Sequence, residues 1–124
     1  MAEVSVSGIM IGSSQPEVLS DFYTQVFDRP PDMKDGGWSG WKSGDSWLSI
    51  GEHSEVQGGA VEPQRVIINM EAQQVQEEFE RLRDAGAAVI KEPYELQGVW
   101  IATLADPDGN YFQLMSPWVP EQTT

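Results

Sequence analysis

The chain repeats its own apolar pattern at a fixed offset. The 57 positions that separate Ile9 from Val66 also separate Phe22 from Phe79, and strand-like and helix-like stretches recur at the same phase. Alternating apolar and polar residues predict a strand, whereas apolar residues at intervals of three and four predict an amphipathic helix. Each half therefore has the same predicted order, a strand followed by a helix, and the fold must accommodate two similar units.

The length of 124 residues sets the domain organisation. A chain of this size supports one hydrophobic core but not two independent ones. Two copies are too few for a solenoid, which needs at least three repeats. We therefore expect a single domain over residues 1–124, with one module at about 1–58, a polar, Gly-rich linker near 52–63, and a second module at about 62–119.

Periodicity and turn residues predict the individual elements. Ser14 stands three residues before Glu17, as in a capping box that opens a helix, and Pro30 ends that helix. The turn sequence from Asp106 to Asn110 contains Pro107 and Gly109 and predicts a tight hairpin. Strands are expected at residues 4–11, 38–42, 46–51, 65–70, 88–91, 100–105 and 111–117, and the second helix at about 73–85.

The duplicated unit, the stretch Asp21-Phe22-Tyr23 in the first helix and the final hairpin Ala105-Asp106-Pro107-Asp108-Gly109-Asn110 together resemble the vicinal oxygen chelate superfamily. That superfamily contains glyoxalase I, bleomycin-resistance proteins and extradiol dioxygenases. The resemblance covers residues 4–118. It implies an α+β fold of two tandem βαβββ modules, whose curved sheets enclose a cleft that a second subunit often completes.

The resemblance also implies four positions for metal ligands in metal-dependent members. They correspond here to Gly8, Arg65, Gln113 and Ser49, or Gly51 in place of Ser49 after a small slip. Only glutamine among these residue types is a reasonable ligand, and arginine repels a divalent cation. The chain also has one His, whereas a two-His-one-carboxylate site needs two. We expect no metal and no other cofactor.

Composition narrows the remaining functions. The chain has no Cys, which excludes disulfides and thiolate catalysis. Seven basic against 20 acidic residues leave a net charge of −13, which disfavours nucleic acid and indicates either a self-repelling surface or attraction of cationic small molecules. No apolar run reaches the roughly 20 residues of a membrane span, so a cytoplasmic location without membrane contact is expected.

Strand alternation and the five Trp residues predict a binding face. Aromatic rings with a few polar groups suit a large, partly aromatic ligand, although Trp also fills cores and subunit interfaces. We expect no catalytic residue; His53 is interpreted as a loop residue. The predicted ligand-binding residues are Trp38, Trp41, Trp47, Ser49, Arg65, Asn69, Tyr94, Trp100, Tyr111, Gln113 and Met115.

The leading hypothesis is a homodimeric, metal-independent protein that binds and sequesters an aromatic, hydrophobic small molecule, cationic in one interpretation. An antibiotic is the favoured ligand, as in the bleomycin-resistance proteins that the chain resembles. The alternative is a glyoxalase-like lyase or isomerase, or another enzyme of the superfamily with an atypical site that uses Gln113, His53 and a carboxylate. A third hypothesis is an accessory protein that recognises a peptide or a partner domain.

Overall fold

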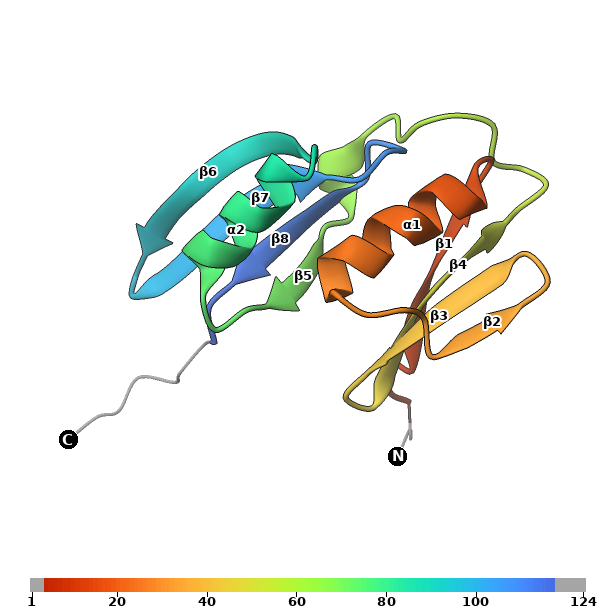
Figure 1. Cartoon of the computed structure of the whole chain (residues 1–124), viewed down its shortest axis with the longest axis horizontal. Coiled ribbons are helices and arrows are strands. Elements are labelled where there is room, and N and C mark those ends of the chain that lie inside the picture. The colour runs from red at the N-terminus through yellow and green to blue at the C-terminus, as the bar shows by residue number, and fades with distance from the viewer. Residues whose placement is uncertain (1–3, 118–124) are drawn as a thin grey trace. The chain divides into compact units, whose positions relative to one another are not determined.

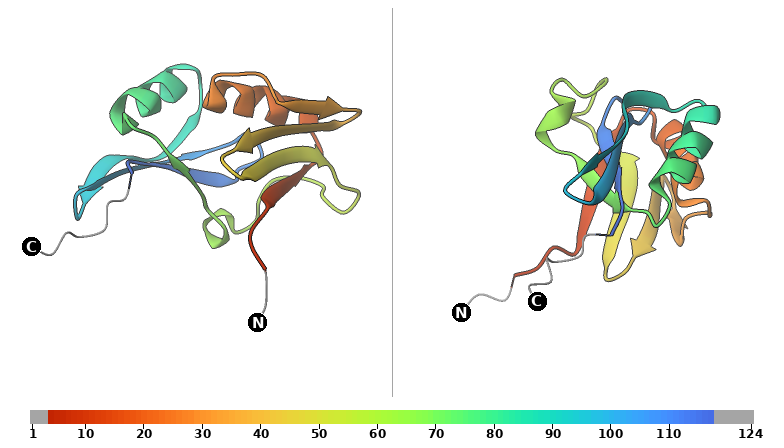
Figure 2. Two further views of the ribbon diagram at one scale, coloured as in Figure 1. Left: turned by 90° about the horizontal axis from the view of Figure 1, so that it is seen from below. Right: turned by 90° about the vertical axis from the view of Figure 1, so that its left-hand side faces the viewer.

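The computed structural model describes residues 4–117 of the chain, which divides into two compact units, Met1–Gly58 and Gly59–Thr124. Each unit contains one long helix and one four-stranded sheet, and the helix lies across one face of its own sheet (Figures 1 and 2). Trp118 lies outside the described residues. Within the part of the chain that is described, no helix has the length and apolar character needed to cross a membrane.

The first unit has the strand order β1-β4-β3-β2, with β1 parallel to β4 and the other pairs antiparallel. A parallel pair needs a long connection between its strands. Here α1 and the β2–β3 hairpin lie between β1 and β4 in the chain. The elements are β1 (Gly8–Ser13), α1 (Pro16–Phe27), β2 (Met33–Asp35), β3 (Trp38–Ser43) and β4 (Ser46–Glu52).

The second unit repeats this connectivity in the order β5-β8-β7-β6, again with one parallel pair, β5 with β8. The predicted α+β fold of two βαβββ modules is therefore confirmed. That the two modules share a single core stays a prediction. The elements are η1 (Pro63–Arg65), β5 (Ile68–Glu71), α2 (Val75–Asp84), β6 (Ala88–Leu96), β7 (Val99–Ala105) and β8 (Tyr111–Met115).

The core of each unit lies between its helix and its sheet. Apolar residues at helical spacing face alternate residues of the central strands, as the sequence predicts. Phe22, which the repeat aligns with the buried Phe79, is only half-buried, and its neighbour Tyr23 is fully buried instead. The buried apolar residues include Ile11, Leu19, Tyr23, Leu48 and Ile50 in the first unit and Val75, Phe79, Leu82, Leu104, Phe112 and Leu114 in the second.

Both modules begin their first strand later than the sequence predicts. The strand β1 starts at Gly8 rather than residue 4, and Val4 is exposed. In the second module, η1 occupies Pro63–Arg65 and β5 starts at Ile68, which leaves Val66 exposed rather than in the core. The alternation of apolar residues therefore continues beyond the paired part of each strand.

The predicted capping box is absent, whereas the predicted hairpin is present. The N-cap residue of α1 is Gln15, which makes no side-chain cap; its backbone N–H donates to Oγ of Ser13 at 3.0 Å. In the hairpin, Oδ1 of Asp106 accepts from the backbone N–H groups of Asp108 and Asn110 at 2.9 and 3.0 Å. A short acidic side chain that satisfies two turn amides explains why this turn is readable from sequence.

Trp41 joins β3 to the segment that follows α1. Its ring is fully buried and stacks on Phe27, with 5.3 Å between ring centroids. Its indole Nε1–H donates to the backbone carbonyl of Arg29 at 3.1 Å. The Trp thus fills a large volume and also satisfies a polar group at the end of the helix.

Asp32 also links the segment that follows α1 to β3, through hydrogen bonds at the protein surface. Its Oδ2 accepts from Nη1 of Arg29 at 2.6 Å and from the backbone N–H of Lys42 at 2.7 Å. The guanidinium of Arg29, and then the backbone N–H of Lys42, keep the pKa of the Asp32 carboxyl below its ordinary value of 3.8. The ionised form is therefore favoured in the folded protein.

Asp32→Asn is expected to lower the melting temperature at neutral pH. Because the pKa is lower in the folded than in the unfolded chain, the carboxylate contributes stability above pH 3.8 and loses it as the pH falls through the lowered value. The melting temperatures of wild type and variant should therefore converge in acid. Thermal unfolding followed by circular dichroism across this pH range measures the gap, and a gap that is constant with pH contradicts the assignment.

Candidate functional site

Each sheet has one face without a helix, which we call the helix-free face. In the first sheet Leu48 and Ile50 point toward α1, so Trp47 and Ser49, which alternate with them, lie on the helix-free face. Strand register places the neighbours of these residues. The helix-free face of the first sheet comprises Gly8, Met10, Gly12, Met33, Asp35, Trp38, Gly40, Lys42, Trp47, Ser49 and Gly51.

Two indole rings on this face each lie over a glycine of the neighbouring strand. A methyl group placed on Gly51 would overlap the ring of Trp38. A methyl group placed on Gly40 would lie 3.2 Å from Cε3 of Trp47. Because a Cβ stands roughly perpendicular to its sheet, both rings must lie close against the sheet surface. The glycines are required here, and the result is an aromatic surface built from Trp38 and Trp47.

Trp41 does not belong to this surface. It alternates with Trp38 and Gly40 in β3 and therefore points toward α1, where it is fully buried. The prediction of Trp41 as a wall of the ligand site is corrected: its Gly-rich surroundings indicated poor packing as core, but in the predicted strand its side chain points toward α1 and fills the core. Ser39 shares its orientation and accepts a hydrogen bond from Ser20 at 3.0 Å.

The helix-free face of the second sheet carries five of the eleven predicted residues, namely Asn69, Tyr94, Tyr111, Gln113 and Met115. Phe112 and Leu114 point toward α2, so the residues that alternate with them in β8 lie on the other side. Register adds neighbours from β5, β7 and β6. This face comprises Asn69, Glu71, Lys91, Tyr94, Leu96, Val99, Ile101, Thr103, Ala105, Tyr111, Gln113 and Met115.

Arg65 and Trp100 lie elsewhere. Arg65 belongs to η1 rather than to a strand; its side chain is 79% exposed and lies 3.5 Å from Glu62. Trp100 alternates with Ile101 and so shares the helix side of β7 with Ala102. The prediction of Arg65 assumes that the strand already includes this residue, whereas the structure places it in η1. Trp100 is predicted as an aromatic residue of the second module, and its position in β7 puts it on the helix side.

The sequence prediction omits several residues of the second helix-free face, among them Thr103 and Lys91. The position of Thr103 on this face follows from the alternation of side chains in β7, so the sequence could have predicted it. The position of Lys91 could not be predicted, because the pairing of β6 with β7 has register shifts between Val89 and Lys91 and between Lys91 and Tyr94. A β-bulge changes which side chains share a face without a clear sequence signal.

The side chains at the superfamily's metal positions do not fit a divalent ion. A methyl group on Gly8 would lie 2.7 Å from the backbone oxygen of Trp47, and the space above Gly51 holds the ring of Trp38. Arg65 lies outside the sheet. In residues 4–117, no three side chains from the set His, Cys, Asp and Glu come together as a possible metal group. We therefore derive no metal chemistry for this site.

His53 has a local structural role. Its Nδ1 accepts from the backbone N–H of Glu55 at 3.1 Å, and its carbonyl accepts from Val56 at 3.0 Å. A methyl group on Gly12 would lie 2.9 Å from the Cβ of His53, so the side chain packs against β1. These contacts agree with the interpretation of His53 as a loop residue that holds the chain after β4.

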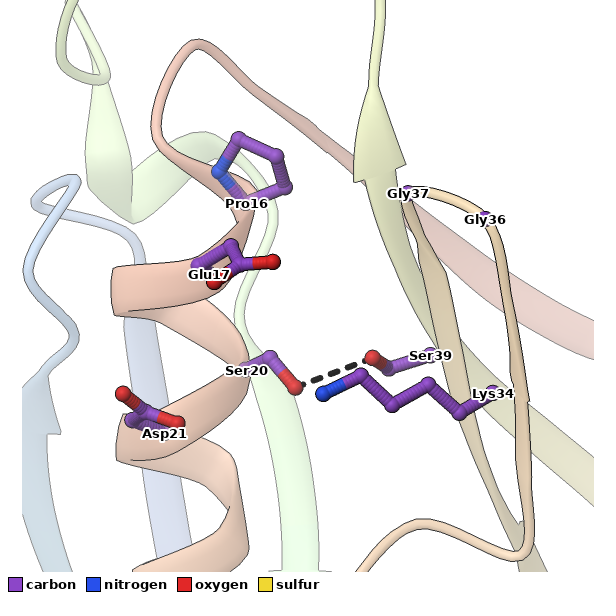
Figure 3. Close-up of a pocket in the computed structure, with 8 residues that line it drawn as sticks. All are labelled: Pro16, Glu17, Ser20, Asp21, Lys34, Gly36, Gly37 and Ser39. Carbon is purple, nitrogen blue, oxygen red and sulfur yellow. Dashed lines mark hydrogen bonds between the residues drawn. The ribbon is translucent and has the colours of Figure 1, made fainter.

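A small polar pocket lies on the helix side of the first sheet, between α1 and the β2–β3 hairpin (Figure 3). Its charged groups are the carboxylates of Glu17 and Asp21 and the ammonium of Lys34. The hydrogen bond between Ser20 and Ser39 crosses the pocket. Its size suits water rather than an aromatic ring. Its lining residues are Pro16, Glu17, Ser20, Asp21, Lys34, Gly36, Gly37 and Ser39.

Gly8→His is expected to destabilise the protein without creating a metal site. The new Cβ would collide with backbone rather than with a flexible side chain, which costs about 1–3 kcal/mol by analogy with overpacked cores. Gly37→His is the matched control, because a Cβ there has open space. Thermal unfolding and zinc titration of both variants are the measurements. Stoichiometric zinc uptake by Gly8→His at an unchanged melting temperature would contradict the conclusion that this position does not fit a metal ligand.

Comparison with known proteins agrees with the fold. No curated protein matches the chain significantly. A glyoxalase/bleomycin resistance protein/dioxygenase family enzyme from Burkholderia phytofirmans PsJN superposes with a TM-score of 0.74 at 24% identity, covering 91% of this chain and 98% of that one. TnmS3, an antibiotic binding protein from Streptomyces sp. CB03234, superposes with a TM-score of 0.75 at 23% identity, covering 95% and 99%.

These identities establish a shared fold and leave the activity open. The family evidence is direct, because the glyoxalase-like domain matches residues 8–115, which is most of the chain. The same residues contain both βαβββ modules and both helix-free faces. The resemblance to the vicinal oxygen chelate superfamily is thereby confirmed, and the chain belongs to the glyoxalase-like domain family.

Proposed function

We propose that the protein binds and sequesters an aromatic, hydrophobic small molecule, an antibiotic in particular, without transforming it. The observation that carries the proposal is the pair of indole rings laid over Gly51 and Gly40 on the helix-free face of the first sheet. The structural similarity to TnmS3, an antibiotic binding protein, supports the same class of ligand. The poor fit of the residues to a metal favours binding over metal-assisted chemistry.

The aromatic surface suits a flat ring system. Trp38 is half-buried and Trp47 is 38% exposed, so both retain surface for a ligand while their positions are set by the glycines beneath them. Stacking on each ring contributes about 0.5–1.5 kcal/mol beyond the area buried. Met10 and Met33, on the same face, add flexible apolar surface that adapts to different ring outlines.

Polar groups for orientation accompany this apolar surface. Ser49 lies between Trp47 and Gly51 on β4 and offers a hydroxyl. The second helix-free face, described by itself, has its own polar group in the amide of Gln113. A mostly apolar surface with few polar groups is the usual composition of a small-molecule site. A homodimer in the cytoplasm, as expected from the sequence, is also part of the proposal, and analytical ultracentrifugation tests the dimer.

The test is a titration of intrinsic Trp fluorescence with polycyclic and glycopeptide antibiotics. Saturable quenching by planar polycyclic compounds, with the ligand recovered unchanged after release, is the expected result. Absence of binding across the panel by folded protein would contradict the proposal. Metal analysis of protein purified without a His-tag separates the alternative: a stoichiometric divalent ion would favour a glyoxalase-like lyase or isomerase.

A further inference from the structure

We infer that Lys91 selects aromatic ligands that carry an anionic oxygen, such as a carboxylate or phenolate. The inference rests on the proposed function and specifies the class of ligand for the same protein. It comes from the second helix-free face, where four polar residues occupy one line across the sheet. Strand register pairs Lys91 with Thr103, Thr103 with Gln113, and Gln113 with Asn69.

This polar row crosses all four strands, from β6 through β7 and β8 to β5. Gln113 donates from Nε2 to Oγ1 of Thr103 at 3.4 Å, which leaves the Thr103 hydroxyl hydrogen for another acceptor. The ammonium of Lys91 and the amide of Asn69 add further donors at the two ends. Both end residues are exposed, whereas Thr103 is mostly buried. Because Thr103 is only 7% exposed, the donors that the row offers to acceptor oxygens on a ligand are those of Lys91 and Asn69 at its exposed ends.

The ammonium of Lys91 is held on the face by an aromatic ring. Its Nζ lies 5.0 Å from the centroid of Tyr94, at a distance typical of a cation–π contact. Each of the four arginines in the described chain forms an ion pair with a carboxylate, whereas no such pair is present for Lys91 among residues 4–117. Its positive charge is therefore available to a ligand.

The acidic residue on the same face lies at the far edge of the sheet. Glu71 belongs to β5, and three strand spacings separate that strand from β6, which is about 14 Å. At this separation, charges exposed to solvent are largely screened at physiological salt. Glu92 and Glu95 are also exposed on β6, and register pairs Glu95 with Trp100 on the helix side. Lys91 thus supplies a positive charge on the helix-free face in a chain of net charge −13, and this charge favours an anionic ligand over the cationic one that composition allows.

Next to the polar row lies an apolar row that receives the rings of such a ligand. Register pairs Tyr94 with Ile101 and Ile101 with Met115. In β7 and β8 these residues are two positions along the strand from Thr103 and Gln113 of the polar row. A ligand with its rings on the apolar row would place an oxygen substituent at the polar row. Charge-assisted hydrogen bonds from an ammonium are among the stronger polar contacts in proteins.

The experiment compares three probes with the same ring system: anthraquinone-2-carboxylate, anthraquinone-2-carboxamide and 2-(aminomethyl)anthraquinone. Isothermal titration calorimetry gives Kd for wild type, Lys91→Met, Lys91→Arg and Lys34→Met. Lys34 is the matched control, because it is an exposed lysine on the helix side of the first sheet. Melting temperatures confirm that each variant is folded.

Wild type is expected to bind the carboxylate most tightly and the amine most weakly. Lys91→Met should weaken the carboxylate about tenfold, the effect of one charge-assisted hydrogen bond, and leave the amide unchanged. Lys91→Arg should retain the preference, since it keeps the charge and the cation–π contact, and Lys34→Met should change nothing. Equal wild-type affinity for carboxylate and amide, or an equal loss of both in Lys91→Met, would overturn the role of Lys91. Failure of all three probes to bind would instead overturn the proposed function, and the inference with it.

Discussion

Trp41→Ala is expected to lower the free energy of unfolding by about 3–5 kcal/mol, the usual cost of emptying a large aromatic site in a core. Trp41 is fully buried, stacks on Phe27 and donates to the carbonyl of Arg29. Its removal therefore leaves a cavity and a polar group without its donor. Urea unfolding followed by circular dichroism is the measurement.

Two controls separate the contributions. Trp47→Ala removes an equally large but 38% exposed side chain and should cost far less stability. Trp41→Phe keeps an aromatic ring against Phe27 but removes the donor to Arg29, which by itself costs about 1–3 kcal/mol. Equal losses in Trp41→Ala and Trp47→Ala would mean that Trp41 is not the core residue that the structure indicates.

Trp38→Ala is expected to raise Kd for anthraquinone-2-carboxamide about tenfold or more, as truncation of an aromatic anchor in a binding site commonly does. This neutral probe tests ring contacts on the first helix-free face without a contribution from ligand charge. The matched control is Trp100→Ala, which removes an exposed Trp from the helix side of the second sheet. Calorimetry measures both, and an equal effect of the two substitutions would contradict the assignment of Trp38 to the site.

Gly51→Ala extends this test without removing any atom from the ligand surface. The added methyl group overlaps the ring of Trp38, so the indole must leave its position over β4. We expect weaker binding of the same probe, whereas Gly37→Ala, with open space around the added Cβ, should bind normally. Unchanged binding by Gly51→Ala would show that the position of the indole does not matter.

Local chemistry explains which parts of the fold are readable from the sequence. The turn from Asp106 to Asn110 depends on one acidic side chain and one glycine at φ +85°, so neighbouring residues decide it. The second helix buries Phe79 and Leu82 at helical spacing, as predicted. The connectivity followed from repeating one unit twice. The turn and the helix arise from contacts close together in the chain, whereas the parallel pairs, such as Gly8 with Trp47, join residues that are distant in the chain.

The candidate site was less predictable, because it depends on register between strands. Trp38 and Trp41 have similar Gly-rich surroundings, yet one lies on the helix-free face and the other fills the core. Lys91 reaches its face through shifts in the pairing of β6 with β7. Arg65 lies in η1, before the first residue of β5, although the 57-residue repeat aligns it with Gly8 of β1. A one-residue change in strand phase reverses the face of every side chain that follows.

The amino-acid sequence by itself determined the duplicated strand–helix order, the final hairpin and the scarcity of metal-binding side chains, because each depends on residue type and local spacing. Only the tertiary structure decided which aromatic rings and which cation share a surface. Glycines at positions 40 and 51 leave room for indoles from neighbouring strands, and the pairing of β6 brings an ammonium beside Tyr94. Those juxtapositions depend on hydrogen-bond register between strands, which residue periodicity alone does not specify.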